Sequence, residues 1–347
     1  MTLGPLMIDV QGTALTEEDR ELMQHALVGA VILFTRNFES VEQLERLVAD
    51  IRAIRTPPLL VTVDHEGGRV QRFRKGFTLL PPMRTIGRQY DLDQAAGKVL
   101  ARQCGWLMAA ELRAVAIDMS FAPCVDLDYG VSSVIGDRAF HRDPQVVAEL
   151  AVAFMGGMRE AGMAATAKHF PGHGAVAPDS HVAIPVDRRE LPDLDEDLYP
   201  YRRLIANGLP AVMAAHVIFD QVDDLPAGFS SRWMQQELRE NLGFDGAIFT
   251  DDLSMKGAEV VGDMPHRAAA ALKAGCDVLS LCNDRKGVLQ VIESLQGTGD
   301  PLSQVRMVRL HGKPDPTRSA LRASAEWQTC EAAVRGCMER PDLKLNS

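Results

Sequence analysis

The sequence lacks several patterns that mark common classes of protein. Its six cysteines form no C-x-x-C pair and no spacing typical of a disulfide framework, which favours a reducing compartment. The amino terminus has no basic stretch followed by a long apolar run, and no apolar run approaches the length of a membrane span. We therefore expect a cytoplasmic protein without a signal peptide and without a membrane partner.

The chain also has fewer positively charged residues than negatively charged ones. The chain has 37 lysines and arginines against 47 aspartates and glutamates, which gives a formal net charge of −10. Binding to a nucleic acid would require a basic face on the protein surface. We therefore expect no nucleic-acid partner, although a local basic pocket is compatible with this balance.

Short apolar runs alternate with helical patterns along most of the chain. Eight runs have the composition of strands, at 6–9, 30–34, 59–63, 119–122, 163–168, 211–215, 247–250 and 278–281. Helical patterns separate them, at 16–25, 40–51, 92–114, 143–162, 199–207, 231–241 and 266–274, and a last one follows at 286–295. This alternation predicts an α/β fold: a single (β/α)8 TIM-type barrel over 1–300 with a mostly helical tail, 301–347, packed on it.

The alternative architecture is an open, doubly wound sheet. A dinucleotide-binding fold of that kind would carry G-x-G-x-x-G after its first strand, and the sequence has no such pattern there. No composition break or long linker divides the chain into separate units. The barrel is therefore the favoured prediction.

Polar residues gather after six of the eight predicted strands. In a barrel the active site lies at the carboxyl ends of the strands, so these residues would converge there. Any one of them could be a helix cap or half of an ion pair, but their joint placement predicts a functional site. In chain order they are Asp64, Glu66, Arg69, Arg72, Asp126, Asp128, Asp137, Arg138, Lys168, His169, His173, Asp179, His181, His216, Asp251, Asp252 and Asn283.

The densest of these segments is 168–181, which holds a lysine, three histidines and an aspartate among two glycines and two prolines. A solvated connector would be the ordinary interpretation of such a polar, turn-rich loop. Its position directly after an apolar strand favours a functional role instead. We expect it to form one part of the site.

The residue types suit a polyhydroxylated ligand. Carboxylates accept hydrogen bonds from hydroxyl groups, while lysine, arginine and histidine donate them, and a sugar needs this mixture. A metal site is the rival interpretation, because His169, His173, Asp179 and His181 could supply ligands. The loop lacks H-x-H and H-E-x-x-H, however, and we expect neither a metal nor a cofactor.

Five segments together resemble glycoside hydrolase family 3 β-N-acetylhexosaminidases, and most of all the bacterial cytoplasmic type that acts in peptidoglycan recycling. They are VDHEGGRVQR at 63–72, IGDR at 135–138, KHFPGHG at 168–174 with DSH at 179–181, MAAH at 213–216 and FTDDLSM at 249–255. The KHFPGHG block with its downstream DSH is the most specific of them. The likeness extends from about residue 6 to residue 283.

The resemblance implies a retaining exo-β-N-acetylglucosaminidase that works through a covalent glycosyl-enzyme. Its substrates would be peptidoglycan fragments, GlcNAc-1,6-anhydroMurNAc and its peptides, and the protein would act as a monomer. The family pattern assigns the nucleophile to Asp251, the proton donor and acceptor to His181, and assistance of that histidine to Asp179. It assigns contacts with the sugar to Asp64, Arg72, Arg138, Lys168 and His169.

Other classes of function stay open at this point. Asp252 is the alternative nucleophile, because it adjoins Asp251. A metal-dependent barrel hydrolase, a phosphorylase and a non-catalytic sugar-binding protein are the alternative activities. Retention of a nucleophile and an acid/base pair argues against the last of these, because binding alone requires neither.

Overall fold

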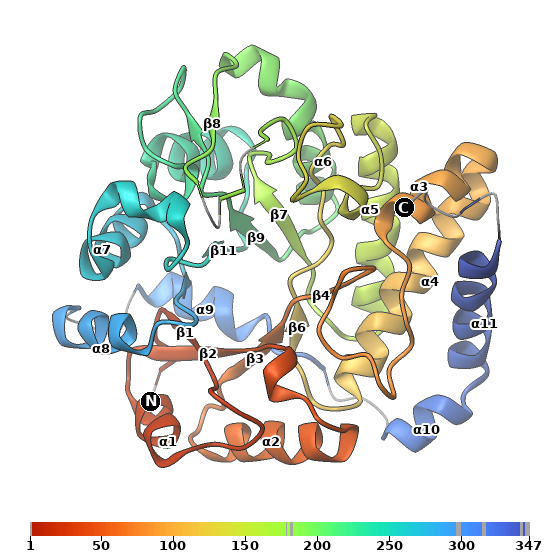
Figure 1. Cartoon of the computed structure of the whole chain (residues 1–347), viewed down its shortest axis with the longest axis horizontal. Coiled ribbons are helices and arrows are strands. Elements are labelled where there is room, and N and C mark those ends of the chain that lie inside the picture. The colour runs from red at the N-terminus through yellow and green to blue at the C-terminus, as the bar shows by residue number, and fades with distance from the viewer. Residues whose placement is uncertain are drawn as a thin grey trace.

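Parallel strands occupy the centre of the molecule, and helices lie around them (Figure 1). The structure is a computed structural model that describes residues 2–177, 179–180, 183–295, 300–313, 317–340 and 343. It has the α/β class predicted from the sequence. No helix within these described ranges is long and apolar enough to cross a membrane.

Eight strands carry the architecture, and each of them overlaps a predicted strand. They are β1 (Leu6–Asp9), β2 (Val28–Leu33), β3 (Leu60–Val63), β6 (Met119–Ser120), β7 (Thr166–Phe170), β9 (Ala211–Ala214), β11 (Ala247–Thr250) and β12 (Leu279–Ser280). One sheet has the order β12-β1-β2-β3-β6 and a second has the order β11-β9-β7, with every neighbouring pair parallel. Isolated parallel bridges join Met119 to Ala164 and Phe249 to Val278, at the outer strands of the two sheets.

The strands are buried on both faces. Every residue of β1, β2, β3, β7, β9 and β11 is buried, as expected when helices cover a parallel sheet from outside and side chains fill the space within its curl. The rings of Phe121 and Phe249 meet edge to face with centroids 5.2 Å apart. This packing links the two sheets through their interior side chains.

Short additional strands lie after the carboxyl ends of the main ones. The antiparallel pair β4 (His65–Gly67) and β5 (Val70–Gln71) follows β3 directly. The parallel pair β8 (Val186–Asp187) and β10 (Ile218–Phe219) joins the segments that follow β7 and β9. The connections at this end of the sheets are therefore ordered by backbone pairing of their own.

The surrounding helices agree with the predicted pattern except at 83–93, where α3 was not predicted from the sequence. They are α1 (Glu17–Gln24), α2 (Val41–Ala53), α3 (Met83–Leu92), α4 (Gln94–Arg113), α5 (Pro144–Glu160), α6 (Asp195–Ala206), a π-helix (Arg232–Asn241), α7 (Met264–Ala274) and α8 (Arg285–Ser294). The predicted helix 92–114 starts too early, because Leu92 ends α3 and Asp93 is extended. The Asp93 carboxylate instead caps α4 by accepting a hydrogen bond from the Ala96 amide at 3.0 Å.

The carboxyl-terminal segment adds α9 (Pro301–Val308), α10 (Arg318–Ala323) and α11 (Ala325–Glu339). Helix α11 packs along α4 at the edge of the molecule (Figure 1). The indole Nε1 of Trp327 donates a hydrogen bond to Glu111 Oε1 on α4 at 2.9 Å. The tail is thus helical and in contact with the α/β unit, while the predicted division at residue 300 stays a prediction.

All six cysteines are buried and free, which confirms the prediction that the chain has no disulfide framework. Burial raises the pKa of every one of these thiols above its ordinary value. The rise is smallest on α11, where the pKa of Cys330 and the pKa of Cys337 reach about 11.

Candidate active site

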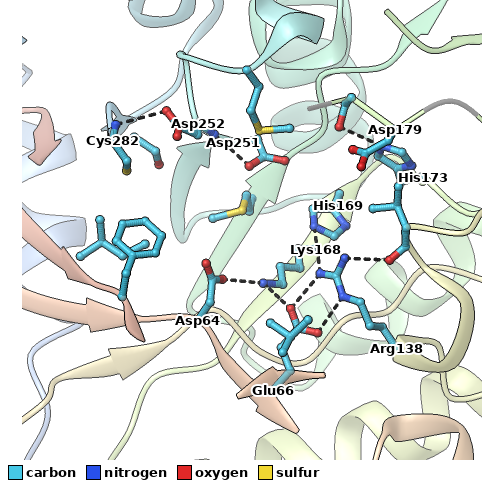
Figure 2. Close-up of a pocket in the computed structure, with 18 of the residues that line it drawn as sticks. Asp64, Glu66, Arg138, Lys168, His169, His173, Asp179, Asp251, Asp252 and Cys282 are labelled. Carbon is cyan, nitrogen blue, oxygen red and sulfur yellow. Dashed lines mark hydrogen bonds and ion pairs between the residues drawn. The ribbon is translucent and has the colours of Figure 1, made fainter. Parts of the chain in front are cut away.

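A pocket of about 330 Å³ opens at the carboxyl ends of the strands (Figure 2). Its walls come from segments that follow β2, β3, β6, β7, β11 and β12. The pocket brings together every residue that the family resemblance assigned to the site and that the structure describes: Asp64, Arg72, Arg138, Lys168, His169, Asp179 and Asp251. Four of the other polar residues that follow strands do not line it: Asp126, Asp128, Asp137 and His216. His181, the predicted proton donor, lies outside the described residues.

Two of the predicted residues lie within a strand rather than in the loop after it. The predicted strand 163–168 ends too early, because β7 runs from Thr166 to Phe170 and includes Lys168 and His169. The predicted strand ends at Lys168 because a charged residue usually marks the end of a buried strand. In the structure Lys168 is only 2% exposed and the strand continues past it. A buried ammonium is tolerated here because two carboxylates surround it.

Four charged side chains form the charged wall of the pocket: Asp64, Glu66, Arg138 and Lys168. The Lys168 Nζ lies 2.9 Å from Asp64 Oδ1 and 2.6 Å from Glu66 Oε1. Arg138 donates to both carboxylate oxygens of Glu66, at 2.9 and 2.8 Å (Figure 2). At the outer end of the wall, Arg72 Nη2 lies 3.4 Å from Asp64 Oδ2.

Burial and pairing act in opposite directions on these groups. Burial by itself raises the pKa of each acid, but Lys168 and Arg72 outweigh it for Asp64, and Arg138 and Lys168 outweigh it for Glu66. The pKa of each acid therefore falls below its ordinary value. Burial likewise favours neutral Lys168, yet the two acids raise its pKa. The charged wall is therefore fully ionised at neutral pH.

The imidazole of His169 is held by an acid that the sequence assigned to no role. Asp126 Oδ2 lies 2.7 Å from His169 Nδ1, and Asp126 also accepts hydrogen bonds from the amides of His169 and His173. Burial raises the pKa of Asp126, but His169 outweighs it and the pKa falls to about 2. An ionised Asp126 fixes the proton on Nδ1, so Nε2 faces Arg138 Nη2, 3.4 Å away, as an acceptor.

Cys124, Asp126 and His169 could in geometric terms hold a metal ion. Their donor atoms already contact each other, because Cys124 Sγ lies 3.3 Å from Asp126 Oδ2 and His169 Nδ1 lies 2.7 Å from the same oxygen. Burial also raises the pKa of the Cys124 thiol well above its ordinary value, so this thiol is protonated in the trio as described. Hydrogen bonds within the trio account for its geometry.

The two aspartates after β11 point in different directions. The Asp252 carboxylate accepts hydrogen bonds from the amides of Ser254 and Cys282, at 3.0 and 3.2 Å, so it ties the end of β11 to the end of β12. Burial raises the pKa of Asp252 to about 6. Asp251 lines the pocket, and in Figure 2 its carboxylate turns toward the space above Lys168 while that of Asp252 turns toward Cys282.

The segment after β7 is anchored next to these aspartates. Ser180 is buried, its hydroxyl lies 3.1 Å from His173 Nε2, and its carbonyl accepts a hydrogen bond from the Gly257 amide. Burial lowers the pKa of His173, which is therefore neutral at neutral pH. These contacts hold Asp179, the neighbour of Ser180, in the lining of the pocket.

Sequence reasoning missed the roles of Glu66, Asp126 and Ser180. Glu66 and Asp126 were noted as polar residues after strands, but Arg138 lies 72 positions from Glu66 and His169 lies 43 positions from Asp126. His216 was also noted, and it does not enter the pocket lining. It stacks on Phe229, with ring centroids 5.3 Å apart, and contacts the carbonyl of Asp252.

Comparison with known proteins identifies the family. The model of the glycosyl hydrolase family 3 N-terminal domain matches residues 5–310. A β-hexosaminidase of Thioalkalivibrio sulfidiphilus is 56% identical over 346 residues, covering all of both chains. A β-hexosaminidase of Methylobacillus flagellatus is 55% identical over 318 residues, covering 91% of each chain.

Solved structures agree with this assignment. NagZ from Neisseria gonorrhoeae, in complex with N-trifluoroacetyl-D-glucosamine, is 42% identical with a TM-score of 0.93, covering 98% of this chain and 99% of that one. A family 3 β-N-acetylglucosaminidase from Paenibacillus sp. is 31% identical with a TM-score of 0.79, covering 99% of this chain and 63% of that one. The chain belongs to glycosyl hydrolase family 3 and is an enzyme of the β-hexosaminidase type.

Proposed function

We propose that this β-hexosaminidase is a retaining exo-β-N-acetylglucosaminidase that removes terminal N-acetylglucosamine from GlcNAc-1,6-anhydroMurNAc and its peptides. The amino-sugar part of the proposal is supported by the likeness to NagZ bound to an N-acyl glucosamine. The peptidoglycan fragment comes from the family resemblance, and the cytoplasmic location comes from that resemblance and from the cysteine pattern of the sequence. We propose in addition that the protein is a monomer. We further infer that the two sheets close into one (β/α)8 barrel. The isolated parallel bridges between their outer strands support this closure.

The observation that carries the proposal is the position of Asp251 in the same pocket as the charged wall. Retention requires a nucleophile on one face of the anomeric carbon, opposite a proton donor that serves the leaving oxygen. Asp251 would attack C1 and form the glycosyl-enzyme. Asp252 is less suited to this role, because its carboxylate turns toward Cys282 and its Oδ1 accepts hydrogen bonds from two backbone amides (Figure 2).

Proton transfer would fall to His181, assisted by Asp179. In this proposal His181 protonates the leaving oxygen in the first step and activates water in the second. Asp179 would orient the imidazole and stabilise its charged form. Support for this pair consists of the family resemblance and of the place of Asp179 in the pocket lining.

The charged wall would bind the hydroxyl groups of the terminal sugar. Lys168 and Arg138 can donate hydrogen bonds to the sugar hydroxyl groups, and Asp64 can accept hydrogen bonds from such groups. The remaining proposed contacts are Arg72 and His169. Because most of these groups are buried and paired before substrate arrives, little side-chain entropy is lost on binding.

A mechanism-based fluorinated glycosyl trap tests the nucleophile. We expect the label on the peptide that contains Asp251 and none on the Asp251→Ala variant. A label on Asp252 would reverse the assignment, and an active enzyme that forms no covalent adduct would point to inversion. Comparing turnover of GlcNAc-1,6-anhydroMurNAc with that of a plain glucoside then tests the proposed substrate.

A chelator tests the metal-dependent alternative, since Cys124, Asp126 and His169 offer a geometric trio. We expect full activity after dialysis against the chelator. Loss of activity that zinc restores would favour a metal-dependent hydrolase.

A further inference from the structure

Glu66 lies at the centre of the charged wall, yet it is not one of the proposed sugar contacts. Its side chain is 2% exposed. Its Oε2 accepts a hydrogen bond from Arg138 Nε at 2.9 Å, while its Oε1 accepts from Arg138 Nη2 at 2.8 Å and contacts Lys168 Nζ at 2.6 Å. Both oxygens are thus occupied by protein cations.

This arrangement makes Glu66 a bridge between two distant segments. Arg138 ends the 3-10 helix Gly136–Arg138, which follows β6, and Lys168 lies in β7. Figure 2 shows Glu66 below both cations, on the side away from Asp251. A carboxylate in that place fixes where the two cations point without itself facing the reacting sugar.

Charge balance gives the bridge a second effect. The Arg138 side chain is 10% exposed and the Lys168 side chain is 3% exposed, so water screens their mutual repulsion poorly. Asp64 pairs with Lys168 and Arg72 rather than with Arg138. Without Glu66, Arg138 would lose the carboxylate that it binds and Lys168 would keep only Asp64, which favours displacement of Arg138 or loss of the Lys168 proton.

We propose that Glu66 is a positioning residue of the glycosidase: it holds Arg138 and Lys168 as a preorganised pair for the hydroxyl groups of the terminal sugar. The proposal rests on the sugar-binding roles proposed above for these two residues. Glu66 would thus increase the affinity for substrate indirectly, by positioning Arg138 and Lys168. The consequence is a specific loss of binding when its charge or its reach is changed.

Two substitutions separate charge from reach. Glu66→Gln removes the charge and places an amide N–H group against a cation, so we expect KM for an aryl N-acetyl-β-glucosaminide to rise about 10- to 100-fold, the order set by a hydrogen bond to a charged group. The dissociation constant of N-acetylglucosamine, measured by calorimetry, should rise in parallel. Glu66→Asp keeps the charge but cannot reach both cations, so KM should rise about tenfold.

The pH profile distinguishes positioning from general support of the fold. Glu66 and Asp64 raise the pKa of Lys168 in the native enzyme, so Lys168 stays charged well above neutral pH. In Glu66→Gln this pKa falls, and the alkaline loss of affinity for N-acetylglucosamine, which needs no proton donor, should begin at lower pH than in the wild type. In Glu66→Asp the alkaline limb should stay close to that of the wild type.

Asp277 provides a matched control, because it is also a buried acid that binds two cations, Arg239 and Arg306. It precedes β12, at the end of the strands opposite the pocket. Asp277→Asn should lower the melting temperature and leave KM within about twofold of the wild type. A folded Glu66→Gln with wild-type KM and sugar affinity would overturn the proposal, and so would wild-type KM in Glu66→Asp if the first variant does not fold.

A double-mutant cycle separates this proposal from the one on which it rests. If Lys168→Met and Arg138→Ala leave sugar affinity unchanged, the proposed binding roles are wrong. If they weaken it, Glu66→Gln should have a smaller effect in the Lys168→Met background than in the wild type, because the contact with Lys168 is already lost while the bonds to Arg138 remain. Full additivity there would show that Glu66 acts independently of Lys168 and would overturn the proposal.

Discussion

Buried acids lie at both ends of the strands, but they contact different kinds of group. At the pocket end, Glu66 contacts Arg138 and Lys168, side chains that line a cavity. At the opposite end, Asp118 contacts Arg52 and Arg113 and also accepts hydrogen bonds from the amides of Val61 and Gly312. One acid organises side chains that a ligand can reach, and the other fastens helices and the tail segment to β3.

The contrast shows that buried charge alone does not mark an active site. Asp118 and Glu66 are equally inaccessible, and each lies between two cations. The functional difference lies in whether the cations adjoin a cavity or the backbone of another element. Substitutions at the two ends should therefore separate catalysis and binding from stability.

The largest effect should come from Asp251→Ala at the pocket end. Removing a nucleophile should lower kcat by about 10⁴-fold or more, while the protein stays folded. Steady-state kinetics and circular dichroism measure the two quantities, with the exposed Asp224→Ala as a control. Substantial residual turnover would contradict the role of Asp251.

Next in size is the stability effect of Asp118→Asn at the opposite end. Breaking a buried, hydrogen-bonded charge pair should lower the free energy of unfolding by about 3–5 kcal/mol. We expect KM to stay within about twofold of the wild type, because none of the described residues that contact Asp118 lines the pocket. A large rise in KM would remove the distinction between the two ends.

Asp126→Asn should have an intermediate effect on activity. The amide can donate to His169 Nδ1, which moves the ring proton to Nε2 and points it at Arg138. We expect kcat/KM to fall about 10- to 100-fold, since a hydrogen bond to a charged group is exchanged for a repulsive contact. NMR of the imidazole nitrogens reports the tautomer directly, and an unchanged tautomer would refute this explanation.

The smallest effect is a pH-dependent one at Asp252. Its pKa rises from 3.8 to about 6 on burial, so between these values the native state binds more protons than the unfolded state. This carboxyl therefore lowers stability as pH increases from about 4 to about 6, by roughly 2 kcal/mol. Asp252→Asn should lack this part of the pH dependence in denaturant titrations, whereas the exposed Asp224→Asn should retain it.

The main strands and most helices could be predicted because their signals are local. An apolar run such as 28–33 in β2 must be buried, and a capping aspartate such as Asp143 before Pro144 starts a helix in any context. The end of β7 was misplaced because the stabilisation of Lys168 within a strand comes from Asp64, 104 positions away. No local pattern records such a partner.

The same reasoning explains which parts of the site were found. The family resemblance assigned eight residues to the site, and the pocket contains the seven of them that the structure describes. The strand-end rule was less selective, because Asp126, Asp128, Asp137 and His216 also follow strands and do not line the pocket. Glu66 and Asp126 could be recognised from the sequence as polar residues, but each of them acts through contacts with other side chains. Those contacts exist only once the strands are side by side, so sequence spacing could not assign them.

The reaction of the six buried cysteines with an alkylating reagent would report how often the structure around each of them opens. Alkylation requires an exposed thiolate, and every thiol here is both covered and shifted toward its protonated form. Each cysteine therefore reacts at the rate at which its surroundings separate. Cys330 and Cys337 on peripheral α11 should be modified first, and Cys124 beside the pocket should be modified when the central sheets come apart.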